Sequence, residues 1–119
     1  MSFDKDTLAA LHDAMEVRIS VGSPARKPVI IWVVVAGDEA FVRSVKGTEG
    51  RWYKTASAAR QGTLEVGDRN LPIRLIPVSD PAAIERASQA YLAKYSTSPY
   101  AQAIVRADVL PTTLRVEPG

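Results

Sequence analysis

The order of hydrophobic and polar positions along the chain predicts a small domain that mixes helices with strands. Apolar residues recur at the helical interval from Leu8 to Met15, and residues 17–21 alternate between apolar and polar. The longest apolar run, residues 29–36, does not alternate over residues 29–35. Such a run is typical of a strand that is covered on both faces. We therefore expect a first helix that begins at Asp4 or Asp6, a half-buried strand, and then a central strand.

Turn residues divide the rest of the chain. Gly37-Asp38-Glu39 predicts a hairpin turn, and Asp80-Pro81 predicts a helix start. Gly62 is placed to end a short helix, and residues 117–119 are expected to fray. The further elements expected are strands over 40–46, 63–66, 71–78 and 112–116, and helices over 51–60, 81–95 and 98–106.

These elements amount to about six strands and three or four helices, with consecutive strands joined by hairpins. The pattern predicts an α+β fold, namely a small, mostly antiparallel split β-barrel with packed helices, as a single domain over residues 1–119. A chain of 119 residues buries enough surface to fold without a disulfide or a metal.

Composition excludes several kinds of chemistry. The chain has no cysteine and one histidine, His12, so a thiolate nucleophile, a cysteine-ligated zinc and a multi-histidine metal site are all excluded. No signal-peptide pattern opens the sequence, and eight apolar residues fall far short of the ~20 that cross a bilayer. We expect a cytoplasmic protein with no metal and no membrane contact.

Charge is distributed unevenly and favours attraction of a small anion. Residues 1–16 carry one basic and four acidic side chains, whereas residues 26–60 carry seven basic and three acidic ones. Within that basic stretch, a glycine-bounded loop leads from Arg43 into a helix that contains Lys54. Because helix starts offer free N–H groups, we expect Arg43 to form a bidentate contact with an anion and Lys54 to add a point charge nearby.

Aromatic residues and glycine spacing leave alternatives open. Trp32 lies in the apolar run and is expected in the core, whereas Trp52 and Tyr53 follow a charged loop and either stack on a planar ring or pack a dimer interface. The Gly47-x-x-Gly50 spacing is found in an RNA-binding loop that joins two helices, but here it follows a strand, so nucleic acid ranks third among the ligands. No catalytic residue is indicated.

Several segments together carry a resemblance to a known family. Trp32-Val33-Val34-Val35, Phe41-Val42-Arg43-Ser44-Val45, Arg51-Trp52-Tyr53-Lys54 and the later Thr112-Thr113-Leu114-Arg115 resemble a bacterial family called domain of unknown function 2255. More distantly, the stretch from Arg26 to Lys54 is similar to the flavin-binding split barrels, which include pyridoxamine phosphate oxidases and deazaflavin-dependent nitroreductases. Two basic segments of those proteins, Gly-Arg-x-Ser-Gly and Ser-Arg-Lys, are absent from this sequence.

The distant resemblance implies a site and two functions. It places Ser44, Lys46, Gly47 and Gly50 at the end of a cofactor-lining strand and in the loop after it. Trp52, Tyr53 and Lys54 fall at the start of the adjacent helix, and Arg26 and Lys27 where the relatives have basic residues. One interpretation is a homodimeric oxidoreductase that binds FMN or a deazaflavin. The other is a non-catalytic barrel dimer that binds another small anion or no ligand.

Overall fold

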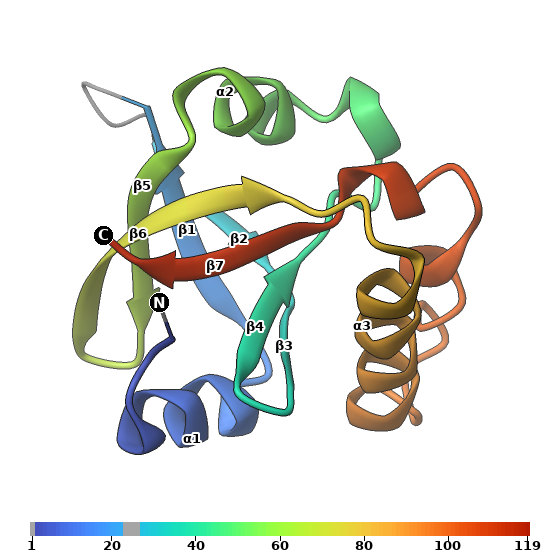
Figure 1. Ribbon diagram of the computed structural model, residues 1–119, viewed down its shortest axis with the longest axis horizontal. Helices are drawn as coiled ribbons and strands as arrows, with labels where there is room; N and C mark the ends of the chain where they lie inside the picture. The colour runs from blue at the N-terminus through green and yellow to red at the C-terminus, as the bar shows by residue number, and fades with distance from the viewer. Residues whose placement is uncertain (1, 23–26) are drawn as a thin grey trace.

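A computed structural model describes residues 2–22 and 27–119 of the chain (Figure 1). The elements in chain order are α1 (Lys5–Asp13), β1 (Val17–Val21), β2 (Val29–Ile31), β3 (Val33–Ala36), β4 (Glu39–Val42), the 3₁₀ turn η1 (Gly47–Glu49), α2 (Arg51–Ala59), β5 (Gln61–Val66), β6 (Arg69–Pro77), α3 (Pro81–Lys94), the 3₁₀ turns η2 (Ala103–Val105) and η3 (Leu110–Thr112), and β7 (Leu114–Pro118).

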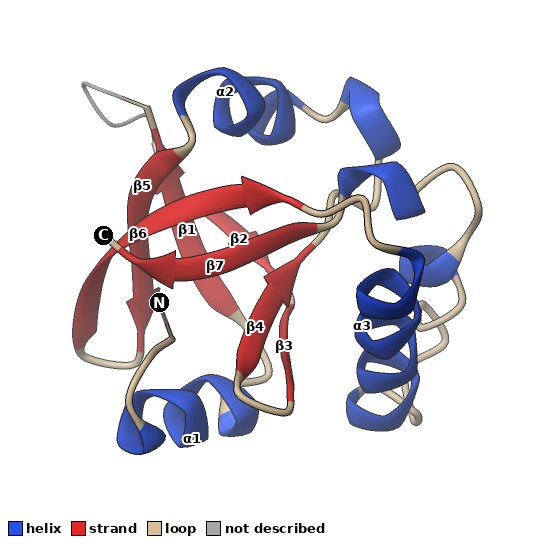
Figure 2. Cartoon of the chain, in the orientation of Figure 1, coloured by secondary structure: helices blue, strands red, loops and turns tan. Residues whose placement is uncertain are grey.

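One seven-stranded sheet curls into an almost closed barrel, with the order β2-β1-β5-β6-β7-β4-β3 (Figure 2). The six strand pairings within the described residues are all antiparallel. The predicted fold class, an α+β split barrel with packed helices, is confirmed, with seven strands where about six were expected.

The barrel is closed by a break in the longest apolar run. Only Trp32 separates β2 from β3, yet these two strands lie at opposite edges of the sheet, β2 against β1 and β3 against β4. The prediction of one central strand over 29–35 is therefore wrong. β3 is covered on both faces, because Val33 points into the barrel core and Val34 into a second core beneath α3. β2 is not covered, since Val29 and Ile30 are 39% and 57% exposed.

Three helices surround the barrel: α1 lies below it, α2 above it and α3 beside β3 and β4 (Figure 1). α1 begins where predicted, with the Asp4 carboxylate accepting from the Thr7 amide. Aspartate and proline also begin α3 as predicted, and Ala87, Tyr91 and Tyr95 of this segment are buried against the outer face of the sheet. No helix of the described residues is long and apolar enough to cross a membrane.

Lys94, near the end of α3, ties three elements together. Its Nζ donates to the carbonyl oxygen of Leu11 at 2.9 Å and to that of Val33 at 2.7 Å. The ammonium also lies 5.4 Å from the centre of the Tyr95 ring. The bond to Leu11 satisfies a carbonyl in the last turn of α1, where a cation is favoured.

Several predicted element ends are wrong. α2 ends at Ala59, with Arg60 as its C-cap in the left-handed conformation at φ 57°, and Gly62 lies inside β5 instead of ending the helix. The strand expected over 40–46 leaves the sheet after Val42. Residues 98–106 form turns and η2 instead of an α-helix. The end of the chain is paired and not frayed, because the Gly119 amide donates to Pro72.

Candidate functional site

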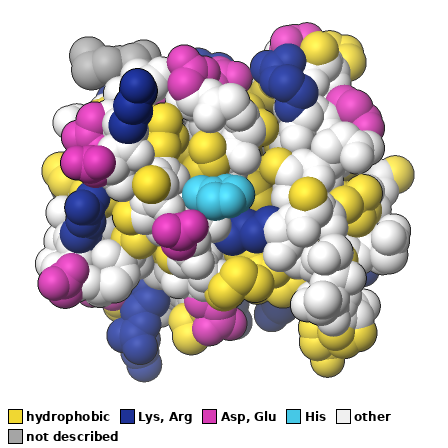
Figure 3. All heavy atoms as spheres, turned by 90° about the horizontal axis from the view of Figure 1, so that it is seen from below, with side chains coloured by type: hydrophobic (Ala, Val, Ile, Leu, Met, Phe, Trp, Pro, Cys, Tyr) yellow, Lys and Arg dark blue, Asp and Glu magenta, His cyan; other side chains and the backbone are white. Residues whose placement is uncertain are grey.

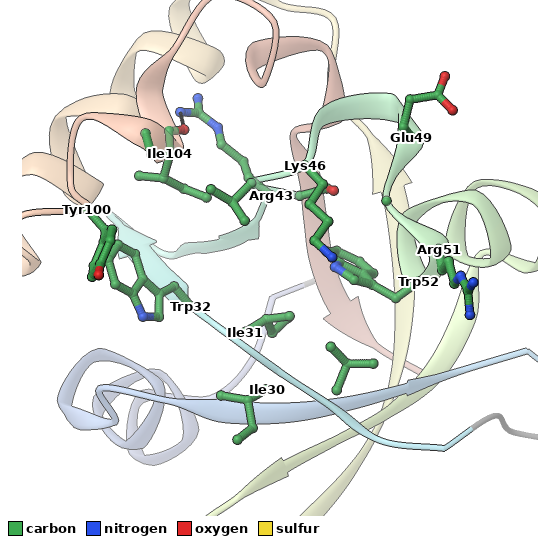
Figure 4. A pocket seen from close by; sticks show the side chains of 15 residues that line it. Ile30, Ile31, Trp32, Arg43, Lys46, Glu49, Arg51, Trp52, Tyr100 and Ile104 are labelled. Atoms are coloured by element: carbon green, nitrogen blue, oxygen red, sulfur yellow. Dashed lines mark hydrogen bonds between the residues drawn. The ribbon is translucent and has the colours of Figure 1, made fainter.

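A cleft of about 660 Å³ opens beside β2, on the side where β2 has no partner strand (Figure 4). Its walls come from β2 and Trp32, from the end of β4 with the start of α2, and from the segment that contains η2. A cleft of this volume can take a cofactor-sized molecule. The lining residues are Val29, Ile30, Ile31, Trp32, Arg43, Ser44, Val45, Lys46, Glu49, Gly50, Arg51, Trp52, Tyr100, Ala103 and Ile104.

Trp32 offers a rigid aromatic surface at one end of the cleft. Its ring stacks on Tyr95 with centroids 3.9 Å apart and an angle of 5° between the planes. Tyr95 is held in turn, because its hydroxyl donates to the Met15 carbonyl at 2.8 Å. Tyr100 lies beside Trp32 and is 70% exposed, and Trp52 lies across the cleft from both (Figure 4). Planar rings and apolar groups therefore find surfaces at both ends.

The Trp52 end of the cleft carries positive charge. Lys46 extends toward Trp52, and Arg51 lies beyond it (Figure 4). Neither forms an ion pair with any described residue. α2 starts at this point with Gly50 as its N-cap and no side chain bonded to its first amides. Free amide hydrogens together with two cations make this end suited to an anion.

Ser44 is the buried polar group that faces this end. The residue is 1% exposed and lines the cleft, and its amide donates to Thr112 Oγ1 at 3.0 Å. Its hydroxyl has no hydrogen-bond partner among the described residues. A Cβ at Gly50 would overlap that hydroxyl, so glycine lets the start of α2 approach Ser44 closely. A ligand atom at this point can be bonded by Ser44 without displacing a protein partner.

Arg43 and Lys54 do not form the predicted anion site. Arg43 is 2% exposed, and its guanidinium turns away from the cleft toward Ile104 (Figure 4). Burial lowers the pKa of Arg43, while Tyr91 and then Glu85 oppose that shift. Lys54 does not line the cleft, and its Nζ is paired with Glu49 at 3.0 Å. The prediction that these two groups converge on one pocket is wrong, because the Arg43 guanidinium is bonded to buried protein oxygen atoms and Lys54 is paired with Glu49 at the surface.

The other predicted site residues are divided between the cleft and its surroundings. Trp52 lines the cleft, whereas Tyr53 lies outside it with its hydroxyl 3.4 Å from the Pro111 carbonyl. Gly47 is buried at φ 69°, behind the lining. Lys27 is exposed just ahead of β2, and Arg26 falls outside the described residues.

Sequence reasoning did not place Trp32, Tyr100 or Ile30 in the site, whereas Arg51 was among the basic residues considered for an anion site. The sequence predicted a core position for Trp32, and its ring does pack on Tyr95. Trp32 is only half-buried, however, because it also lines the cleft. Tyr100 and Ile30 come together at the cleft only when the whole chain folds into the barrel, and local sequence patterns do not predict that arrangement.

Two observations bear on metal and nucleic acid binding: the arrangement of possible metal ligands among the described residues, and the charges on one face of the molecule. No group of three or more His, Cys, Asp or Glu side chains among those described residues is arranged to hold a metal ion. Seen from below, where α1 lies, basic, acidic and apolar side chains intermingle (Figure 3). Nucleic acid binding relies instead on a continuous basic surface.

Comparison with known proteins shows the family and the fold. The sequence profile of a family described as an uncharacterised protein conserved in bacteria, DUF2255, matches residues 7–116. Among proteins with curated descriptions, none matches this sequence.

Two solved structures share the fold at low sequence identity. A Listeria innocua protein named as a pyridoxamine 5'-phosphate oxidase is 11% identical, with a TM-score of 0.60, and the alignment covers 93% of this chain and 87% of that one. A conserved hypothetical protein from Mycobacterium tuberculosis is 10% identical, with a TM-score of 0.62 and coverage of 98% and 79%.

Proposed function

This chain belongs to the bacterial DUF2255 family, as its sequence predicted, and on that premise we propose that its cleft binds a flavin or deazaflavin nucleotide for hydride transfer with a small molecule. The shared fold with a protein named as a pyridoxamine 5'-phosphate oxidase supports the proposal. The single observation that carries it is the pairing, within one cleft, of an aromatic surface with a cationic end.

The residues present fit such a cofactor. Trp32, braced by Tyr95, and Trp52 offer surfaces for a planar ring. Lys46, Arg51 and the first amides of α2 suit a phosphate, and the Ser44 hydroxyl lines the cleft with them. Lys46 and Arg51 thus take the role in phosphate binding that Arg43 and Lys54 were expected to play.

A bound flavin would itself supply the hydride chemistry, and the protein would bind and orient it. The cleft contributes apolar walls that exclude water, through Ile30, Ile31 and Ile104. Its one carboxylate, Glu49, is bonded to Lys54 and points away from the cleft (Figure 4). The site therefore favours substrates that are neutral or negatively charged.

Ligand titration with matched variants tests this function. We expect FMN or a deazaflavin nucleotide to raise the melting temperature of the wild type. Changing Lys46 and Arg51 together to alanine should weaken FMN binding about 100-fold, since a charge-assisted hydrogen bond contributes about 1.5–3 kcal/mol. Lys54→Ala is the matched control and should leave affinity unchanged. Binding of FMN that survives in the double variant, or a wild type that binds neither nucleotide, would contradict the proposal.

The rim of the cleft supports a second candidate, a barrel dimer. Ile30, Val45 and Tyr100 are apolar, line the cleft and are 57%, 47% and 70% exposed. Contiguous exposed apolar groups of this kind mark interaction surfaces. We infer that a second copy covers this rim, whether or not a flavin binds. Sedimentation of Ile30→Asp should show monomers where the wild type shows dimers, and a monomeric wild type would exclude this candidate.

A further inference from the structure

Arg43 is a buried cation that is surrounded by neutral oxygen atoms. We propose that Arg43 is a positioning residue that does not touch the ligand. It fixes two walls of the cleft relative to each other, namely the segment after β4 and the segment that contains η2. The inference rests on the proposed function for its effect on binding, but its structural part can be tested without any ligand.

The guanidinium bonds to three separate parts of the chain. Its Nε donates to Thr113 Oγ1 at 2.9 Å, just ahead of β7. Nη1 donates to Ser88 Oγ at 2.9 Å and Nη2 to the Ile84 carbonyl at 2.9 Å, both on α3. Nη1 also donates to the Ile104 carbonyl in η2 at 3.3 Å. These partners lie 41 to 70 positions away along the chain.

Two of the segments joined in this way form neighbouring walls of the cleft. The residues that directly follow Arg43, namely Ser44, Val45 and Lys46, form one wall, and Ile104 lies on the other (Figure 4). η2 is a single 3₁₀ turn, so its own hydrogen bonds fix its position weakly. One further bond joins the same walls, from Arg106 Nη2 to the Val45 carbonyl at 3.1 Å, but it is exposed to solvent. The buried connection between the walls is therefore the Arg43 side chain.

The physical chemistry of arginine explains why this residue type is needed. A guanidinium remains charged at any pH the protein meets, so its burial has a lasting cost that only well-placed acceptors offset. Four acceptors at 2.9–3.3 Å satisfy it here, and the Tyr91 ring lies 5.4 Å from its Cζ. Lysine has no planar fork and cannot reach α3, η2 and Thr113 at the same time.

Hydrogen exchange tests the structural part of the inference. We expect Arg43→Met to speed amide exchange of residues 103–106 at least tenfold, while amides of β5 and β6 keep wild-type rates. Arg86→Met is the matched control, because Arg86 lies on α3, the helix to which Arg43 bonds, but pairs with Glu39 at the surface. Equal acceleration in β5 and β6, or no change at 103–106, would overturn the inference. If Arg43→Met does not fold, Ser88→Ala removes one acceptor and should speed the same amides to a smaller extent.

Paired titrations test the effect on binding. We expect Arg43→Met to weaken FMN and riboflavin binding by the same factor, about tenfold, because the cleft wall moves and no phosphate contact is lost. Loss of FMN affinity with riboflavin affinity unchanged would instead show a direct phosphate contact and refute the inference. A wild type that binds neither compound would count against the proposed function alone, since the exchange result stands independently.

Discussion

The half-buried Lys94 predicts an unusual dependence of stability on pH. Burial lowers the pKa of Lys94 from 10.5 to about 8, and Asp13 opposes that shift. Between these two values the unfolded chain holds a proton on Lys94 that the folded protein lacks. Since stability rises with pH wherever the unfolded state binds more protons, folding becomes more favourable from about pH 8 to 10.5.

The size of the effect follows from the two pKa values. A difference of about 2.5 pKa units corresponds to about 3 kcal/mol at most. Because the side chain is partly exposed, solvent screening reduces the expected gain to about 1–2 kcal/mol. The gain is absent below about pH 8, where both states carry the charge, and complete above pH 10.5.

The assay compares urea unfolding of the wild type and Lys94→Met at several pH values. Burial raises the pKa of Tyr91 and of Tyr95, so both tyrosines lower stability at high pH, but they do so in both proteins and cancel in the difference. We expect the free energy of unfolding of the wild type, relative to that of Lys94→Met, to rise by about 1–2 kcal/mol between pH 7.5 and 10.5. Lys5→Met, on the exposed side of α1, is the control.

One result would refute this reasoning. The Lys94 ammonium donates to the carbonyls of Leu11 and Val33, and these bonds favour its charged form. A difference that stays flat or falls with pH would show that the two hydrogen bonds outweigh burial.

Three further substitutions probe the packing of the fold. A Cβ at Gly62 would overlap the Ser20 carbonyl oxygen, so Gly62→Ala should lower the free energy of unfolding by denaturant by about 2–3 kcal/mol. Gly67 lies in open space at φ 60°, so Gly67→Ala should lower that free energy by only about 1 kcal/mol. Equal losses in the two variants would contradict the packing argument. Tyr91→Phe removes the hydroxyl that donates to the Trp32 carbonyl at 3.1 Å and should cost about 1–2 kcal/mol, and a calorimetric melting temperature equal to the wild type would refute that contribution.

Local patterns predicted the elements well, because each depends on neighbours in sequence. The alternation of residues 17–21 became β1, and Asp80-Pro81 began α3. The break at Trp32 was not predictable in the same way. Residues 29–35 look like one strand, and only the partners of each half, β1 and β4, separate them. Strand partners are chosen by the whole fold, so no window around Trp32 contains that information.

The candidate site shows the same division. The resemblance to the flavin-binding split barrels indicated Ser44, Lys46 and Gly50, and these residues do meet in one cleft. The role of Arg43 was misread because a basic residue on an apolar strand suggests an anionic partner. Its actual partners are hydroxyl and carbonyl oxygen atoms of residues between 84 and 113, and the sequence around Arg43 does not predict these distant contacts.

The position of β7 bears on how this protein is made in the cell. β7 lies between β6 and β4, so it alone connects the two groups of strands on either side of it. While the ribosome is still adding residues 114–118, β3 and β4 have no link to β6 through the sheet. Much of the apolar interior therefore stays open until synthesis has passed this segment, and a nascent chain stalled shortly before it would be a substrate for chaperones.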